Sequence, residues 1–240
     1  MDRVILKQSK MTHHRFYIPA DKRELRHELW IDDPKLVHQW QKVLRFRIGD
    51  ELVLFDGERH ERLYRVVQLG DKAYKLTHIT DLVRQVPKRH LYLFWSILKK
   101  DKNDFVVQKC TELGVVHFIP LVTERSEVKM LDIERLLKIA VEAAEQCGRS
   151  DIPKIHEPMT LMQAVGVYAQ KFPLVTASMD GQDVADVPDT LGLLVGPEGG
   201  WSDSERDIMT THDTSDIVLS NHVLRAETAS ITGAARLMLA

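Results

Sequence analysis

The residues with the clearest chemical meaning form a glycine-rich turn near the end of the sequence. The turn, Gly196 to Gly200 with the sequence GPEGG, follows an apolar run at 191–195 that predicts a short buried strand. Ser202 and Glu205 then form the Ser-x-x-Glu pattern of a helix start. A turn with so little side-chain bulk lets a planar ligand approach the backbone closely. On its own, the pattern also fits a tight connection without a ligand.

A second segment further along the chain has complementary features. Residues 219–229, with the sequence LSNHVLRAETA, leave an apolar strand, cross a polar turn and enter a helix rich in small residues. Small side chains at the start of a helix leave room for a ligand. The two segments can therefore line one pocket.

Other ligand classes lack their usual signatures in this sequence. No GxGxxG or Walker pattern occurs, and the glycine turn follows a late strand, whereas dinucleotide-binding folds place it after the first strand. Doubly wound methyltransferases also need a glycine turn after the first strand of the domain, but here residues 99–102, KKDK, follow the apolar run at 91–98. The 11 histidines are scattered, and His13, His14 and His222 lack partners at zinc-site spacing. No metal site is expected.

Residues 84–109 are the most basic stretch of the chain. They hold seven lysines and arginines against two aspartates, with Lys99 and Lys102 among the basic residues. Such a run can face the phosphates of a nucleic acid. A solvated linker and helix face would explain the same charges.

The elements that must position these residues change in type near residue 83. Strand patterns with short turns occupy 15–19, 51–55, 63–69 and 74–79. Between the first two of them, Asp33-Pro34 starts a helical pattern that Gly49 closes, with Trp40 on its core face. We therefore predict a small β-rich domain over residues 1–83.

From Leu91 onward, strands alternate with helices, which is typical of an α/β domain. The expected strands are 91–98, 115–122, 174–177, 191–195 and 216–220. The expected helices are 104–113 closed by Gly114, one capped by Asp132, one opened by Thr160 with Gln163, one opened by Ser202 with Glu205, and 227–239. The second predicted domain spans residues 84–240.

The composition indicates a soluble globular protein of the cytoplasm. The 240 residues are 44% hydrophobic and 28% charged, which allows a substantial core. No apolar run is long enough to span a membrane, and the N-terminus lacks the layout of a signal peptide. Cys110 and Cys147 both have apolar neighbours in helical patterns, so buried free thiols are expected rather than a disulfide.

Several segments together resemble one known family. LLVGPEGGWSDSE, LSNHVLRAETA, FVVQKCTELGV, ERSEV and AVEAAEQCGR are similar to the ribosomal small-subunit RNA uridine N3-methyltransferases of the SPOUT superfamily. RFYIP and VLRFRIGDELVLFDG resemble the PUA-like RNA-binding barrel at the N-terminus of that family. The likeness spans nearly the whole chain from Met11. It implies an α/β domain with a trefoil knot, a homodimer with the active site near the subunit interface, and 16S ribosomal RNA as the partner, possibly within the assembled small subunit.

The resemblance also implies the cofactor, S-adenosylmethionine, and the residues that hold it through backbone groups and apolar contacts. They are Thr176, Leu194, Gly196, Pro197, Glu198, Gly200, Leu219, Asn221, Val223 and Leu224. Ser220 stands where the family more often has glycine. A serine is tolerable there if its backbone torsions are ordinary.

The implied reaction needs a group that deals with the N3 proton of uracil, because that proton must leave before or during methyl transfer. Glu145 and Glu227 are the carboxylates within the matching motifs, and the sequence does not choose between them. Arg225 can steady a phosphate or a uracil oxygen, or it can form an ion pair with Glu227 or Glu198. These three residues are the catalytic candidates.

The expected RNA contacts are spread along the chain. Arg15 and Tyr17 lie in the β-rich domain, where an arginine can clamp an unpaired nucleotide and an aromatic ring can stack on it. The others are Lys99, Lys102, Arg125 and Arg149. Core packing for Tyr17, and helix-end capping for Arg149, are the competing interpretations.

Two rival functions remain open at this stage. One is a SPOUT enzyme that methylates ribose oxygen or a guanine, and the other is a non-catalytic RNA-binding assembly factor that retains the fold. The intact glycine turn and the pair Arg225 and Glu227 favour catalysis. Residues 1–10 precede the usual start of the family, which makes Met11 a candidate initiator and residues 1–11 a leader.

Overall fold

The chain separates into two units, with the division between Arg84 and Gln85. The computed structural model describes residues 13–126, 130–183 and 186–240. Each unit has a β-sheet and a hydrophobic core of its own. The expected leader, residues 1–11, lies outside the described ranges.

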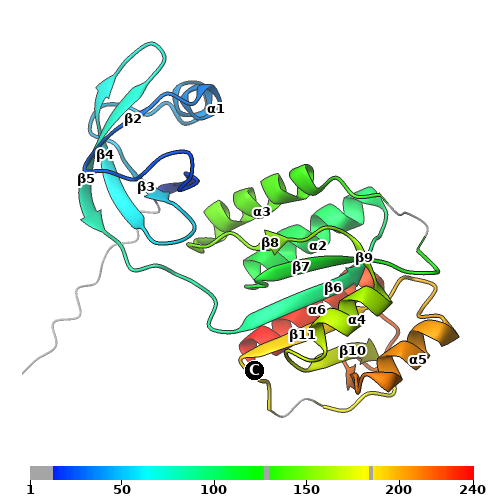
Figure 1. Cartoon of the computed structure of the whole chain (residues 1–240). Coiled ribbons are helices and arrows are strands. Elements are labelled where there is room, and N and C mark those ends of the chain that lie inside the picture. Colours follow the sequence, from blue (N-terminus) through cyan, green and yellow to red (C-terminus); the bar gives the residue numbers. More distant parts are fainter. Residues whose placement is uncertain (1–12, 127–129, 184–185) are drawn as a thin grey trace, which may run out of the picture. The chain divides into compact units, whose positions relative to one another are not determined.

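The N-terminal unit is built on a five-stranded sheet with the order β1-β3-β4-β5-β2 (Figure 1). Its elements are β1 (His14–Tyr17), β2 (Glu28–Ile31), α1 (Pro34–His38), the π-helix η1 (Gln39–Leu44), β3 (Glu51–Phe55), β4 (Glu61–Leu69) and β5 (Tyr74–Asp81). Strands β1 and β3 are parallel, and the other neighbours are antiparallel. Trp40 is fully buried and packs against Phe16 and Tyr74, so its predicted core position is confirmed.

The helical segment of this unit ends earlier than the sequence predicts. Asp33 caps it by accepting hydrogen bonds from the backbone N–H groups of Lys35 and Leu36. At the other end, Arg45 has a left-handed conformation with φ of 56° and donates its N–H to the carbonyl of Trp40. Gly49, the predicted end of the helix, lies in the following turn with φ of 99°.

The C-terminal unit is organised around a sheet of parallel strands with the order β12-β10-β11-β6-β7-β8, and β9 also pairs with β7. The strands are β6 (His90–Ser96), β7 (His117–Val122), β8 (Lys154–Ile155), β9 (Met159–Thr160), β10 (Leu174–Ser178), β11 (Thr190–Val195) and β12 (Ser215–Val218). The helices are α2 (Lys100–Glu112), α3 (Ile133–Cys147), α4 (Leu161–Tyr168), α5 (Asp203–Thr211) and α6 (Ala226–Leu239). The predicted α/β class is confirmed.

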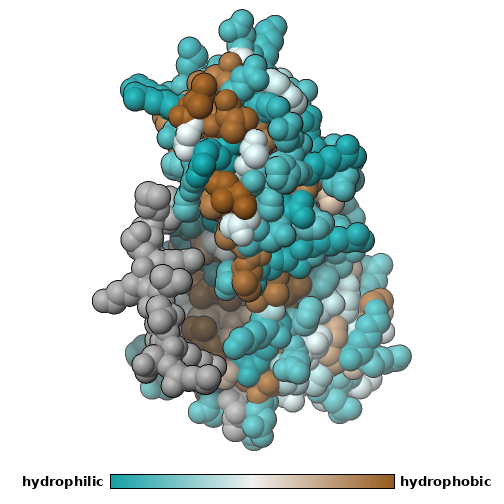
Figure 2. All heavy atoms as spheres, turned by 90° about the vertical axis from the view of Figure 1, so that its left-hand side faces the viewer, coloured by the Kyte–Doolittle hydropathy of each residue, from teal (hydrophilic) through white to brown (hydrophobic). Residues whose placement is uncertain are grey.

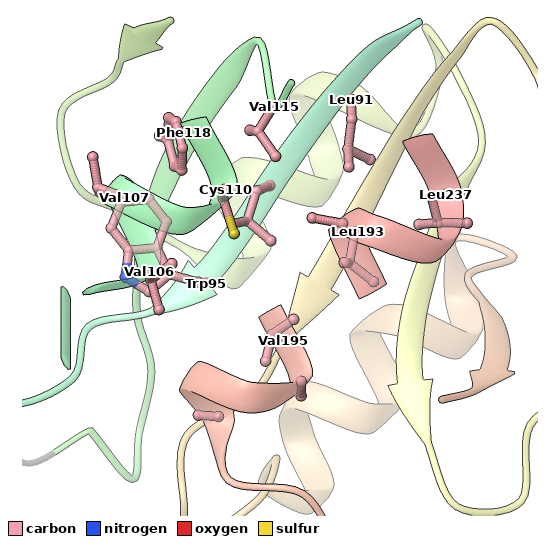
Figure 3. Close-up of a cluster of buried hydrophobic side chains, with 14 of the residues drawn as sticks. Leu91, Trp95, Val106, Val107, Cys110, Val115, Phe118, Leu193, Val195 and Leu237 are labelled. Carbon is pink, nitrogen blue, oxygen red and sulfur yellow. The ribbon is translucent and has the colours of Figure 1, made fainter. Parts of the chain in front are cut away.

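Helices cover both faces of this sheet, as the continuous apolar runs of its strands require. Figure 3 shows one face, where Leu193 and Val195 of β11 and Trp95 of β6 meet side chains of α2 and Leu237 of α6. On the other face, Phe94 and Ile119 pack against α4. The strands are thereby fixed, and the loops at their carboxyl ends emerge from a rigid layer.

Local sequence signals place most helix starts correctly. Asp132 caps α3, and both predicted capping boxes, Thr160 with Gln163 and Ser202 with Glu205, are present. Helix α2 instead begins at Lys100, earlier than predicted, because the charged run at 99–102 forms its first turn, where Asp101 suits the positive end of the helix dipole.

Both thiols are free, but only one of them is buried as predicted. Cys110 lies in the core, where burial raises the pKa of its thiol. Cys147 is exposed, because the buried stripe of α3 ends at Ala144 and Gly148 terminates the helix in a left-handed conformation. The prediction of a buried Cys147 was wrong.

The surface is mainly hydrophilic on the face that Figure 2 shows, with several separate hydrophobic patches. In the ranges that the structure describes, no helix is long and apolar enough to cross a membrane. The same ranges contain no cluster of three or more His, Cys, Asp or Glu residues that could hold a metal ion.

Candidate cofactor and catalytic site

A cavity of about 620 Å³ lies at the carboxyl edge of the parallel sheet, where open α/β sheets usually bind their ligands. It is formed by the loops that follow β10, β11 and β12, together with α5 and the start of α6. Both glycine-turn and second-loop segments contribute to it, so the two loops do line one pocket. The predicted cofactor residues among its lining are Thr176, Gly196, Pro197, Glu198, Gly200, Leu219, Val223 and Leu224.

The glycine turn is shaped by Trp201. The side chain of Trp201 is 6% exposed, and its Nε1 donates a hydrogen bond to Oγ1 of Thr176 at 3.2 Å. A Cβ atom on Gly196 would lie 3.0 Å from the Trp201 ring, so a larger residue would require the ring to shift. Gly200 has φ of 70°, a conformation that favours glycine, and its N–H closes the turn on the carbonyl of Pro197.

The second loop presents apolar side chains to the cavity. Leu219, Val223 and Leu224 line it, and Val223 is 84% exposed. Asn221 is exposed and is not among the lining residues that the structure describes. Leu194 is buried in β11 behind the cavity, where its carbonyl accepts a hydrogen bond from Thr176 Oγ1. Leu194 therefore supports the wall rather than forming its surface.

Lys102 joins two carboxylates next to the cavity. Its Nζ lies 2.7 Å from Oε1 of Glu198, on the glycine turn, and 3.3 Å from Oε2 of Glu227, on α6. The hydrogen bond between Lys102 and Glu198 lowers the pKa of Glu198 and raises the pKa of Lys102. We call Lys102, Glu198 and Glu227 the lysine side of the cavity.

Glu227 differs from Glu198 in its surroundings. Its side chain is 14% exposed, against 48% for Glu198. Its Oε2 is buried and, within the described chain, accepts no hydrogen bond despite its distance of 3.3 Å from Lys102. Neighbouring residues of α6, Ala226 and Ala229, line the cavity. A partly buried carboxylate beside a ligand cavity can accept a proton.

The other two catalytic candidates lie in different surroundings. Arg225 is the exposed N-cap residue of α6, and its side chain makes no capping hydrogen bond. Glu145 lies half-buried on α3, and no residue of α3 is among the described residues that line the cavity. Glu227 is not itself among the described lining residues, but it lies on α6 between Ala226 and Ala229, which do line the cavity. Glu145 has no such neighbours.

The loop after β7 is tied to the glycine turn. Arg125 donates a hydrogen bond from Nη1 to the carbonyl of Gly199 at 2.8 Å. The backbone N–H of Glu124 donates to Oε1 of Glu205 at 3.0 Å, and Ser204 donates to Glu124. Glu205 is buried and belongs to the capping box of α5. The predicted RNA contact Arg125 thus sits on a loop whose position depends on the cofactor turn.

The predicted RNA residues of the N-terminal unit lie next to each other on β1. Arg15 forms an ion pair with Glu61 and lies over the Phe55 ring, 5.2 Å from its centroid. Tyr17 is half-buried and packs on the same Phe55 ring, and its burial raises the pKa of its hydroxyl. In the C-terminal unit, Lys99 is exposed directly before α2.

Arg149 is engaged inside the C-terminal unit. It is 6% exposed, its guanidinium forms a two-point contact with Asp151 at 2.9 and 2.6 Å, and it donates to the carbonyls of Thr111 and Val115. Such a buried arginine fixes the connection after α3. In this geometry Arg149 does not present its charge to RNA.

Sequence reasoning missed a group of polar residues that line the cavity. They are Ser178, Asp180, Arg206, Thr210, Thr214 and Asp216. The sequence does carry a signal for part of this group, since Ser178 and Asp180 stand where a parallel strand ends. Arg206 and Asp216 follow no local pattern.

Comparison with known protein families defines the class of this fold and site. A family model described as an RNA methyltransferase domain matches residues 84–238, and one described as an RNA methyltransferase PUA domain matches residues 41–77. Ribosomal RNA small subunit methyltransferase E of Rickettsia conorii is 29% identical, over 95% of this chain and 96% of that protein. The protein of the same name from Bacillus subtilis is 31% identical, over 81% and 84%. The chain belongs to the ribosomal RNA small subunit methyltransferase E family, which confirms the resemblance seen in the sequence.

Solved structures agree with this placement. A Legionella pneumophila methyltransferase in complex with S-adenosylmethionine has a TM-score of 0.84 and 31% identity, and the match covers 95% of this chain and 97% of that one. Ribosomal RNA small subunit methyltransferase E of Neisseria gonorrhoeae, also bound to S-adenosylmethionine, has a TM-score of 0.84 and 26% identity, over 93% and 95%.

Proposed function

We propose that this protein transfers the methyl group of S-adenosylmethionine to N3 of a uridine in 16S ribosomal RNA. The observation that carries the proposal is the cavity at the carboxyl edge of the sheet, lined by both matching loops and flanked by Glu227. Membership of the family, and relatives solved with S-adenosylmethionine, support the same cofactor.

The residues of the cavity fit this cofactor. The Trp201 ring packs closely on Gly196, both residues line the cavity, and Leu219 and Leu224 provide apolar walls for an adenine ring. The assigned cofactor residues are Thr176, Leu194, Gly196, Pro197, Glu198, Gly200, Leu219, Asn221, Val223 and Leu224. When bound, the cofactor supplies an electrophilic methyl group, and the protein's part is to hold the acceptor nitrogen in line with it.

Glu227 is our choice for the group that accepts the N3 proton. It lies on α6 between the cavity-lining residues Ala226 and Ala229, and its side chain is only 14% exposed. No residue of α3, which carries Glu145, lines the cavity in the described chain. Glu198 is more exposed than Glu227, and the hydrogen bond from Lys102 keeps the pKa of Glu198 below its usual value. Arg225, at the start of the same helix, is placed to steady a uracil oxygen or a phosphate.

We further propose that residues 1–83 form an RNA-binding domain and residues 84–240 the catalytic domain. Arg15 and Tyr17 on β1, and Lys99, Lys102 and Arg125 at the carboxyl edge, are the assigned RNA contacts. Family resemblance supports a trefoil knot, a homodimer and a cytoplasmic location. In the sheet, β10 lies between β11 and β12. The chain therefore crosses β10 between forming β11 and forming β12, which is compatible with a knot.

The proposal is tested by deleting the gene and mapping 3-methyluridine in small-subunit ribosomal RNA. The modified nucleoside should disappear in the deletion strain and return with the wild-type gene. Glu227→Gln should lower the methylation rate by about 10²–10⁴-fold, since a base is lost while the side-chain shape is kept. Glu145→Gln is the matched control and should remain within a few-fold of wild type, whereas Arg225→Ala should be impaired.

Unchanged 3-methyluridine in the deletion strain would exclude the proposal. Loss of a methylated ribose or guanine instead would point to another SPOUT activity. If purified protein bound ribosomal RNA but not S-adenosylmethionine, a non-catalytic assembly role would be the better conclusion.

A further inference from the structure

The lining of the cavity has two chemically different groups of residues. One group is apolar and includes Trp201, Leu219, Leu224 and Ala229. The other is formed by the end of β10, the edge strand β12 and α5. Its polar residues are Ser178, Asp180, Arg206, Thr210, Thr214 and Asp216. We call Arg206, Asp180 and Asp216 the arginine side of the cavity.

Backbone contacts hold the polar residues together. Asp216 stands opposite Thr176 in the pairing of β10 with β12, and Asp180 follows Ser178, whose Oγ accepts the Asp180 N–H. Thr210 donates a hydrogen bond to the carbonyl of Arg206, one turn earlier in α5. Asp180 and Asp216 thus lie on two paired strands or directly after them, and Arg206 lies on α5; all three side chains are exposed and line the cavity.

Charges on the arginine side are not paired with one another. Among the residues that the structure describes, Arg206 forms no ion pair, and neither do the side chains of Asp180 and Asp216. In the same part of the cavity, Oγ1 of Thr214 is buried without a hydrogen-bond partner. By contrast, Lys102 on the lysine side contacts both Glu198 and Glu227. A cation and two carboxylates that line a cavity without pairing can bind a ligand that carries both signs of charge.

We propose that the arginine side binds the amino-acid end of S-adenosylmethionine, with Arg206 on its carboxylate and Asp180 and Asp216 on its ammonium group. This inference rests on the proposed function. A guanidinium matches a carboxylate with two parallel hydrogen bonds. The apolar part of the cavity then remains for the adenosyl group. An RNA phosphate fits this surface less well, since it has no positive group for the two aspartates.

The test compares ligands that differ only in the proposed contact. S-adenosylmethionine, S-adenosylhomocysteine and 5′-methylthioadenosine are titrated into the full-length protein by calorimetry. The first two carry the amino-acid end, and 5′-methylthioadenosine lacks it. Arg206→Met should weaken binding of the first two about tenfold and leave 5′-methylthioadenosine unchanged. Lys138→Met, at an exposed position on α3, is the matched control and should change none of them.

Two further variants keep the test independent of any general damage to α5. Arg206→Lys should fall between wild type and Arg206→Met, because it keeps the charge but loses the two-point geometry. Asp180→Asn should also weaken only the ligands with an ammonium group. Equal weakening of all three ligands by Arg206→Met, or weakening of RNA binding alone, would overturn the inference. If wild type bound none of the three ligands, the proposed function itself would fail.

Discussion

The lysine side and the arginine side of the cavity contain similar residues, but only those of the lysine side form ion pairs within the described chain. Each has one cation and two carboxylates. On the lysine side, Lys102 bridges Glu198 and Glu227 and so links the start of α2, the glycine turn and α6. On the arginine side, Arg206, Asp180 and Asp216 line the cavity without pairing in the described chain.

The difference separates two uses of charge. Side chains that pair within the protein fix the position of the elements that carry them, and at a partly exposed site this adds little to stability. Unpaired charges in a cavity retain their full capacity for a ligand. We therefore expect the lysine side to orient Glu227, the proposed base, and the arginine side to determine which cofactor is held. The following predictions change the cavity wall and then each of these two roles.

Trp201→Ala should have the largest effect, because Trp201 is buried, packs on Gly196 and lines the cavity. Removing a buried tryptophan costs about 3–5 kcal/mol of unfolding free energy, and the loss of its ring over Gly196 should weaken all adenosyl ligands. Urea denaturation and calorimetry measure both effects. Trp201→Phe keeps a ring and loses the hydrogen bond to Thr176, so it should cost only about 1 kcal/mol. Equal costs for the two variants would contradict the role of the ring as a wall.

The parts of this site that could be predicted are those set by neighbouring residues. The capping boxes of α4 and α5 and the glycine turn are local, since their hydrogen bonds join residues a few positions apart. The glycine turn directly follows the apolar run at 191–195, so its place after a buried strand could also be predicted. The same holds for the second loop, whose polar turn and small-residue helix are contiguous.

The pairing of charges could not be predicted, because it depends on strand order. Asp216 reaches the cavity only because β12 pairs with β10 rather than with β11, and Lys102 meets Glu198 only because β6 neighbours β11. The burial of Arg149 could not be predicted either, because the carbonyls of Thr111 and Val115 that accept its hydrogen bonds are distant in the sequence. Nothing local distinguishes a buried arginine at a helix end from an exposed one.

Glu205→Gln should separate the two sides with an intermediate effect. The buried Glu205 carboxylate accepts from the backbone N–H groups of Ser202 at 2.9 Å and Glu124 at 3.0 Å, and it so fixes the start of α5. Loss of the charge should cost about 1.5–3 kcal/mol in urea denaturation. Because α5 carries Arg206, S-adenosylmethionine should bind more weakly than 5′-methylthioadenosine relative to wild type. Asp207→Asn, at an exposed position of the same helix, is the control and should leave the ratio unchanged.

Lys102→Met should have the smallest effect on stability, about 0.5–1 kcal/mol at neutral pH, because Lys102 and Glu198 are partly exposed and their attraction is screened. The contribution should depend on pH with a defined sign. The lowered pKa of Glu198 gives stability that is present above the ordinary glutamate value, about 4.3, and is lost as the pH falls through the folded value.

The raised pKa of Lys102 places the other limit of this contribution at alkaline pH. Its stabilisation is complete below the ordinary lysine pKa of about 10.4 and is lost as the pH rises through the folded value. The difference in unfolding free energy between wild type and Lys102→Met should therefore be widest between these limits and vanish near pH 3. Lys102→Arg should retain it. A difference that stayed constant down to that pH would mean that the lysine stem, rather than its charge, holds Glu198 and Glu227 in place.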